Sequence, residues 1–220
     1  MTPRSGARSR KSAPKLGAPD RHLIKSDKKL AKLIKADGGI DAATDRRGSR
    51  RDPYETLTMA IVGQQLSTKA AASIWEKVKA LFRGKTPTPK QLLAVDPQDL
   101  RDAGLSWSKV AYVRDLAERV RDGELDLKRL PDLPDEDVIA ELTEIKGIGR
   151  WTAEMFLIFH LGRPDVLSTG DLGIRRAVQL TYGLDDLPGP EEMERIAERW
   201  RPHRTLALLY LWRSLDNAPG

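Results

Sequence analysis

The 220-residue sequence contains no cysteine, which excludes disulfides, thiolate-held zinc, iron–sulfur clusters and a cysteine nucleophile. Aromatic residues make up only 5% of the chain, and the three histidines, His22, His160 and His203, lack the spacing of metal ligands. No apolar run approaches the roughly 18 residues that a membrane span needs. We therefore expect no cofactor for catalysis, no membrane attachment and a cytoplasmic location.

What the sequence does contain is a modest excess of basic residues. Lys and Arg number 38 against 32 Asp and Glu, for a formal net charge of +6 and a pI near 9.5, which is compatible with a polyanionic partner. Part of the excess lies in residues 1–22, which open with "MTPRSGARSRKSAPKLGAP", a stretch without a single acid. Such a segment cannot bury enough apolar surface to fold, so we predict a disordered basic tail. It would serve either as a tether to a polyanion or as a leader.

From residue 23 to residue 220, apolar residues recur at the spacing of helices. Asp27 and Ser67 stand where helix N-caps are expected, and Gly38 and Gly123 stand where helices should stop. A polar, arginine-rich loop is expected over residues 43–53. No run alternates with period two over more than a few residues, so strand signals are nearly absent. The sequence predicts an all-α domain.

One stretch, "LTEIKGIGRWTAEMF" at residues 142–156, places Gly147 and Gly149 just before an amphipathic helix. Glycine at both positions permits positive φ and lets another molecule approach the backbone without meeting a Cβ. The free amides and the positive dipole end of the following helix would suit a phosphate. Taken alone, the pattern is more typical of an ordinary joint between two helices.

The wider context favours the first interpretation, because the stretch resembles the helix–hairpin–helix of the DNA glycosylases of the HhH-GPD superfamily. The run "IKGIG" matches their hairpin, and "PDVLSTGDLGIRRA" follows, in which the spacing from Gly149 to Asp171 fits the family. "IVGQQLSTKAA" at 61–71 and "GLSWSKVAYVRDLA" at 104–117 resemble the helices that precede the hairpin. The resemblance covers about residues 54–212. It implies two helical subdomains that flank a DNA-binding cleft.

The resemblance also implies a chemical role for Asp171. A glycosylase flips its target nucleotide out of the duplex and then breaks the C1′–N bond. Positive charge grows on the sugar in the transition state, where a carboxylate can stabilise it and orient the attacking water. The competing interpretation is that Asp171 is only a helix N-cap.

Trp151 bears on the subclass. Relatives that also cut the strand have a lysine two residues after the second hairpin glycine, and Trp151 at that position cannot form a Schiff base, which implies a monofunctional enzyme. The chain resembles the DNA-3-methyladenine glycosylases II, in their compact form without an N-terminal β-domain. In that branch Trp151 and Trp212 would line the base pocket, where an indole face attracts a cationic alkylated purine. Met155 stands where that branch often has an aromatic residue.

The resemblance finally implies a set of contacts and partners. The partner would be double-stranded DNA containing alkylated bases, bound by a monomer associated with the nucleoid. Backbone carbonyls of Thr143, Ile145 and Ile148 would hold a structural Na⁺ or K⁺ ion. The wedge that fills the hole left by the flipped base would be Gln65 or Leu66. The implied DNA contacts are Gln64, Gln65, Leu66, Lys146, Gly147, Ile148, Gly149 and Arg150.

Two alternatives remain open at this point. The chain could be a helix–hairpin–helix DNA-binding module without catalysis, with Asp171 acting only as a cap. It could instead be a glycosylase for another damaged base, for which Met155 beside Trp151 leaves room.

Overall fold

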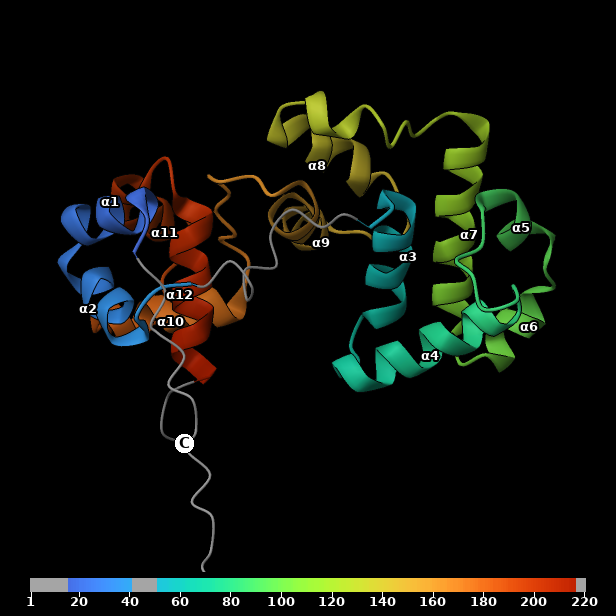
Figure 1. Ribbon diagram of the computed structural model, residues 1–220, viewed down its shortest axis with the longest axis horizontal. Helices are drawn as coiled ribbons and strands as arrows, with labels where there is room; N and C mark the ends of the chain where they lie inside the picture. The colour runs from blue at the N-terminus through green and yellow to red at the C-terminus, as the bar shows by residue number, and fades with distance from the viewer. Residues whose placement is uncertain (1–15, 41–50, 217–220) are drawn as a thin grey trace, which may run out of the picture. The chain divides into compact units, whose positions relative to one another are not determined.

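The computed structural model describes residues 16–40 and 51–216, and every regular element in these ranges is helical (Figure 1). The prediction of an all-α fold is therefore confirmed. Residues 1–15 and most of the expected arginine-rich loop lie outside the described residues. None of the helices in the described ranges is long and apolar enough to cross a membrane.

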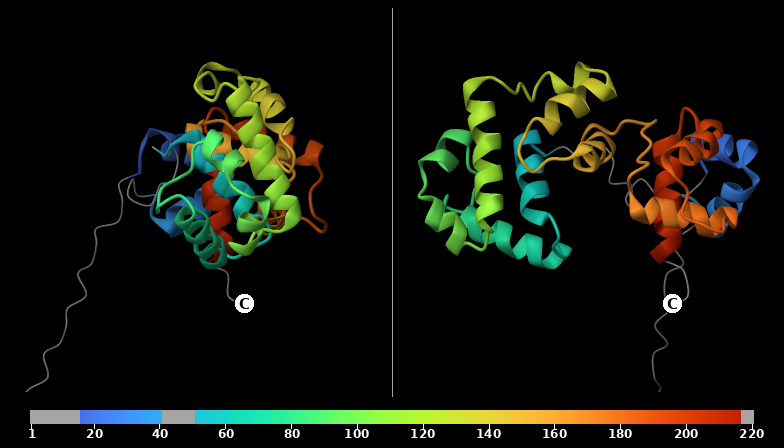
Figure 2. Two further views of the ribbon diagram at one scale, coloured as in Figure 1. Left: turned by 90° about the vertical axis from the view of Figure 1, so that its right-hand side faces the viewer. Right: turned by 180° about the vertical axis from the view of Figure 1, so that it is seen from behind.

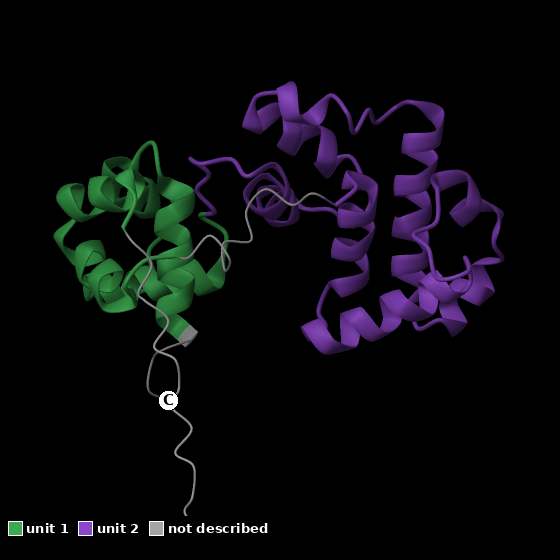
Figure 3. Ribbon diagram, viewed as in Figure 1, with its two compact units in different colours: residues 1–46, 169–220 green, residues 47–168 purple. Residues whose placement is uncertain are grey.

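The chain divides into two compact units (Figure 3). Unit 1 combines the two ends of the sequence, residues 1–46 and 169–220, and unit 2 is the continuous stretch 47–168. The hairpin therefore belongs to unit 2 and Asp171 to unit 1. The predicted cleft between subdomains stays a prediction, because each unit is determined by itself.

Unit 1 is a cluster of helices around a leucine-rich core. Leu23, Leu30 and Ile34 are fully buried, as are Leu208 and Leu211. Its elements are α1 (Ala18–Ser26), α2 (Lys28–Asp37), α10 (Leu172–Tyr182), α11 (Pro190–Ala197), the 3-10 turn η3 (Glu198–Trp200) and α12 (Arg204–Asp216).

The start of unit 1 corrects the predicted end of the tail at residue 22. Helix α1 already begins at Ala18, with Pro19 in its first turn. Asp20 accepts a hydrogen bond from the Gly17 amide at 2.7 Å and another from the Tyr210 hydroxyl. The Tyr210 hydroxyl is far from Asp20 in the sequence, so the spacing of apolar residues could not have predicted this hydrogen bond.

Asp27 joins three segments of unit 1. Its carboxylate caps α2 by accepting from the amides of Lys29 at 2.9 Å and Leu30 at 3.0 Å, as the sequence predicts. It also accepts from the Tyr182 hydroxyl and from the Trp200 indole N–H at 3.1 Å. Burial opposes the charged form, but these hydrogen bonds outweigh it and lower the pKa of Asp27.

Unit 2 is built around α7, which lies side by side with α3 (Figures 1 and 2). Leu57 and Ile61 of α3 and Val113 and Leu116 of α7 are buried between them and their neighbours. The elements of unit 2 are α3 (Pro53–Gly63), α4 (Thr68–Ala80), α5 (Pro89–Ala94), α6 (Pro97–Asp102), α7 (Trp107–Asp122), the 3-10 turn η1 (Leu130–Asp132), α8 (Asp135–Thr143), α9 (Arg150–Phe156) and the π-helical turn η2 (Leu157–Leu161).

The predicted helix boundaries agree with the structure at several punctuating residues. Ser67 caps α4 by accepting from the Ala70 amide, and Gly38 and Gly123 end α2 and α7 in the left-handed conformation. Local hydrogen-bonding chemistry specifies these positions, which is why the sequence alone identifies them.

Replacing Asp27 with Ala should destabilise the protein by about 3 kcal/mol, because the cap is lost and two buried donors lose their acceptor. A carboxylate with a lowered native pKa contributes stability above its unfolded pKa, near 4, and loses that contribution as the pH falls through the native pKa. The difference between wild type and Asp27→Ala in urea unfolding should therefore shrink below about pH 4. A difference independent of pH would contradict an ionised Asp27.

Candidate functional site

The hairpin joins α8 to α9 through residues 144–149. Ile145 and Ile148 turn inward and are 1% and 4% exposed, and the Ile148 amide donates to the Ile145 carbonyl at 3.0 Å. Gly147 between them has φ +81°, a conformation that L side chains rarely adopt. The two isoleucines thus anchor the hairpin in unit 2 while its backbone turns at Gly147.

The surroundings of Gly147 and Gly149 explain in different ways why each position is a glycine. A Cβ on Gly147 would lie 2.2 Å from a ring carbon of Tyr112 in α7, so the tyrosine ring occupies the space that a side chain would need. A Cβ on Gly149 would meet nothing within 4 Å, and φ there is an ordinary −94°. The glycine at 147 is required by packing inside unit 2. The open side of the hairpin is at Gly149, where α9 begins.

Asp115, one turn after Tyr112 in α7, holds the same hairpin. This buried carboxylate accepts from the Lys146 amide at 3.0 Å, from the Lys146 ammonium at 3.0 Å and from Arg119 at 3.2 Å. Burial raises the pKa of Asp115, but the bonds from Lys146 and Arg119 outweigh burial and leave that pKa lowered. Sequence reasoning missed both α7 residues, because nothing local in "AYVRDLA" marks them as partners of a hairpin that comes only after the next α-helix, α8.

The turn between α3 and α4 lies against the hairpin. Gln64, an implied DNA contact, donates its side-chain amide to the Gly147 carbonyl at 2.6 Å, which makes it an internal clamp. The next two residues, Gln65 and Leu66, are exposed, and Gln65 has φ +57°. The two predicted wedge candidates are therefore presented on the surface of unit 2.

The start of α7 lies beside this turn. The Lys109 ammonium donates to the carbonyls of Val62 and Gln64, each at 2.8 Å, and burial lowers the pKa of Lys109. Two residues earlier, Trp107 is 56% exposed. An exposed tryptophan is uncommon, and its exposure makes Trp107 a candidate functional residue that the sequence did not indicate.

The first turn of α9 carries Arg150 and Trp151. Trp151 is half exposed, as a stacking residue would need to be. Arg150 forms a two-pronged ion pair with Glu136, at 2.7 and 3.0 Å, and a further bond to Glu154 at 3.0 Å. Its charge is thus matched within unit 2, which weakens the case for Arg150 as a phosphate contact. Met155 is half-buried on the same helix.

In unit 1, Asp171 caps α10. One of its carboxylate oxygens, Oδ1, accepts from the Ile174 amide at 2.8 Å and from the Trp212 indole N–H at 3.3 Å. The predicted cap is therefore confirmed, and the structure brings two predicted site residues together. Trp151 and Met155 belong to unit 2, so the base pocket that they would form with Trp212 remains a prediction.

The described residues include no group of three or more His, Asp or Glu side chains that could hold a metal ion. Backbone carbonyls are a different kind of ligand, and the cation site that the resemblance implies at the carbonyls of Thr143, Ile145 and Ile148 stays a prediction. The Ile145 carbonyl already accepts from the Ile148 amide, which leaves it one lone pair for a cation.

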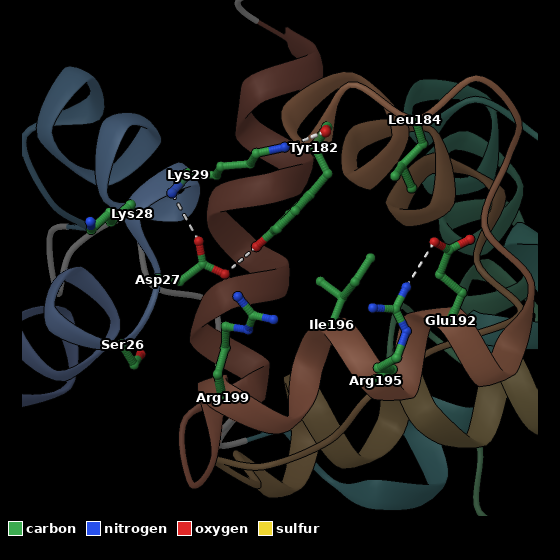
Figure 4. Close-up of a pocket in the computed structure, with 10 residues that line it drawn as sticks. All are labelled: Ser26, Asp27, Lys28, Lys29, Tyr182, Leu184, Glu192, Arg195, Ile196 and Arg199. Atoms are coloured by element: carbon green, nitrogen blue, oxygen red, sulfur yellow. Dashed lines mark hydrogen bonds and ion pairs between the residues drawn. The ribbon is translucent and has the colours of Figure 1, made fainter.

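Unit 1 also contains a cavity of about 470 Å³ at the C-terminal end of α10 (Figure 4). Four cationic side chains line it, together with Asp27, Tyr182 and Glu192; they are Lys28, Lys29, Arg195 and Arg199. Asp27 is occupied by its structural hydrogen bonds, and Glu192 pairs with Arg195 at 3.1 Å. The 11 residues of α10 separate this cavity from Asp171 by about 16 Å, so it lies apart from the candidate catalytic carboxylate.

Gly147→Ala and Gly149→Ala should separate the two glycines by stability. The first places a methyl against Tyr112 at positive φ and should cost at least about 2 kcal/mol. The second meets open space and should cost less than about 1 kcal/mol. Chemical denaturation of both variants measures the difference, and equal costs would mean that Tyr112 does not determine the glycine at 147.

Comparison with known proteins connects these features to a family. Residues 58–202 match the family described as HhH-GPD superfamily base excision DNA repair protein. The Bacillus subtilis protein YfjP is 34% identical over 169 residues, which cover 74% of this chain and 59% of YfjP. The chain thus spans about three fifths of that relative's length.

Two solved structures are similar over most of their length. The DNA-3-methyladenine glycosidase of Bacillus halodurans is 38% identical with a TM-score of 0.80, covering 90% of this chain and 89% of that one. The Schizosaccharomyces pombe 3-methyladenine DNA glycosylase Mag1, in complex with abasic DNA, is 34% identical with a TM-score of 0.80, covering 91% and 97%. With its hairpin, its downstream aspartate and this family match, the chain belongs to the HhH-GPD superfamily of base excision DNA repair proteins.

Proposed function

We propose that the protein is a monofunctional DNA glycosylase that flips out and excises alkylated bases of the 3-methyladenine and 7-methylguanine type. Family membership and the names of the Bacillus halodurans and Schizosaccharomyces pombe relatives support the reaction class. The observation that carries the proposal is Asp171, a buried carboxylate held at the start of α10 by Ile174 and Trp212. Its spacing from Gly149 in the sequence matches the family pattern.

The reaction needs one carboxylate of this kind. As the C1′–N bond breaks, its electron pair leaves with the base, and a base that was cationic departs neutral without needing a proton. The positive charge that develops on the sugar is stabilised by the Asp171 carboxylate. Water then attacks C1′ and loses a proton to Asp171 or to solvent. Trp151 offers no amine for a Schiff base, which is why we assign water as the nucleophile.

The hairpin would hold the DNA backbone. Gly149 is open to solvent, and the amides in the first turn of α9 point away from the helix, where a phosphate oxygen can accept from them. Carbonyls of Thr143, Ile145 and Ile148 would hold a Na⁺ or K⁺ ion, which would supply positive charge to attract a phosphate. Backbone contacts of this kind position the duplex without reading its sequence.

The turn after α3 would supply the side chain that fills the space left in the duplex by the flipped base. Leu66 and Gln65 are exposed, and the Lys109 bonds keep this turn next to Trp107. An apolar side chain inserted into the base stack takes the place of the damaged base when that base leaves the duplex. The enzyme would act as a monomer in the cytoplasm, associated with the nucleoid.

Asp171→Asn tests the proposal directly. Asn keeps an oxygen for the Ile174 amide but carries no charge, so the variant should fold and bind duplex DNA while excision slows by about 10²–10³-fold or more. The measurement is the single-turnover release of methylated bases from alkylated duplex DNA. Asp186→Asn, an exposed neighbour in unit 1, is the matched control and should be unaffected.

Two outcomes would contradict this assignment. Near-normal excision by Asp171→Asn would remove the carboxylate from the chemistry. A wild-type protein that binds DNA but releases no base would indicate a binding module in which Asp171 is only a cap.

Trp151→Ala tests the substrate class. If the indole face selects cationic bases, the variant should lose about 1 kcal/mol more transition-state stabilisation on 7-methylguanine than on neutral hypoxanthine. Single-turnover rates on duplexes that differ only in the lesion give this comparison. Equal losses would mean that Trp151 supports the fold or the flipped geometry without sensing charge, and the alkylated-base assignment would then rest on family resemblance alone.

A further inference from the structure

Helix α9 contains a carboxylate that the proposed reaction does not use. Glu154 is 3% exposed, and each of its two oxygens has a partner. Oε1 accepts from the Arg150 guanidinium at 3.0 Å, and Oε2 accepts from the Ser168 hydroxyl at 2.6 Å. Ser168 is itself fully buried. A carboxylate therefore joins the hairpin helix to the segment that follows the π-helical turn.

Burying the Glu154 carboxylate costs free energy of desolvation. Burial raises the pKa of Glu154, and the bonds from Ser168 and Arg150 offset that effect only in part. Replacing a buried ionic group by an apolar one of similar size is often neutral or stabilising. Stability alone thus gives a weak reason for a glutamate inside α9. Its bond to Ser168 gives a stronger one.

Ser168 is three residues before Asp171. Only Thr169 and Gly170 separate a fixed point in unit 2 from the carboxylate that caps α10, and three residues span at most about 10 Å. Gly170 is exposed, and a Cβ there would meet nothing within 4 Å. The hydrogen bond at Ser168 is therefore well placed to limit how far this short segment can move.

We propose that Glu154 is a positioning residue that, through Ser168, holds the segment carrying Asp171 on the hairpin helix. This inference rests on the proposed glycosylase function. In a transition state that needs a carboxylate beside the sugar, looseness of this segment lowers the fraction of complexes with Asp171 in the reactive geometry. DNA binding by the hairpin does not depend on that bond, because Arg150 keeps its pair with Glu136.

The decisive variant is Glu154→Met, which keeps an unbranched side chain of similar length and removes both acceptors. Single-turnover excision of 7-methylguanine should fall by about ten- to a hundredfold, while the Kd for a duplex containing an abasic site stays within about twofold. Ser168→Ala should lose as much, and the double variant should lose no more than either alone.

Conservative and control variants separate positioning from folding. Glu154→Gln can accept from Arg150 with its oxygen and donate to the Ser168 hydroxyl with its amide, so it should restore the rate to within about threefold. Glu136→Gln removes the other, exposed carboxylate on Arg150 and should leave the rate unchanged. These two retain the side-chain volume, and a rate loss in Glu154→Gln equal to that in Glu154→Met would overturn the proposal.

The dependence on Asp171 is tested in the Asp171→Asn background. If Glu154 acts through Asp171, adding Glu154→Met there should cause little further loss of rate. A full additional loss would mean that Glu154 supports the protein generally, and a wild-type rate in Glu154→Met would also overturn the proposal. Failure of the glycosylase function would show instead in the wild-type protein, which would release no methylated base.

Discussion

The hairpin is a backbone feature that takes its shape from a neighbouring helix. Tyr112 fills the space beside Gly147, and one turn later Asp115 binds the Lys146 amide. Gly147 has φ +81°, and these α7 contacts pack against the turn in that conformation. In the proposed function the hairpin holds the DNA backbone, so the α7 residues Tyr112 and Asp115 would shape the part of the protein that binds DNA.

Much of the fold can be predicted because the residues that start and end a helix lie within a few positions of it in the sequence. Side-chain chemistry within a few residues identifies Asp27 and Ser67 as caps, and Gly38 and Gly123 as helix ends. The start of α1 at Ala18 cannot be identified in this way, because its support comes from Tyr210, which donates to Asp20 from 190 residues away in sequence. Long-range polar contacts of this kind leave no periodic signal.

The candidate site, like the fold, is only partly predictable from the sequence. Spacing and family resemblance identify Asp171 and the hairpin, whereas the partners that hold them are visible only in three dimensions. Gln64 illustrates the difference, since its position in a family motif implies DNA contact and the structure directs its amide to the Gly147 carbonyl. Trp107, equally, becomes a candidate only through its exposure and its proximity to the turn held by Lys109.

The charge balance at the hairpin has a consequence for how the protein meets undamaged DNA. Lys146 pairs with Asp115, and Arg150 pairs with Glu136 and Glu154, so the two basic side chains of the hairpin region add little net charge to the surface that is proposed to meet a phosphate. Few condensed counterions would then be released when the hairpin engages a phosphate. If the protein acts as proposed, its contact with ordinary duplex should therefore be brief, which favours rapid dissociation and rebinding along the genome and leaves long residence to sites where a damaged base has been flipped out.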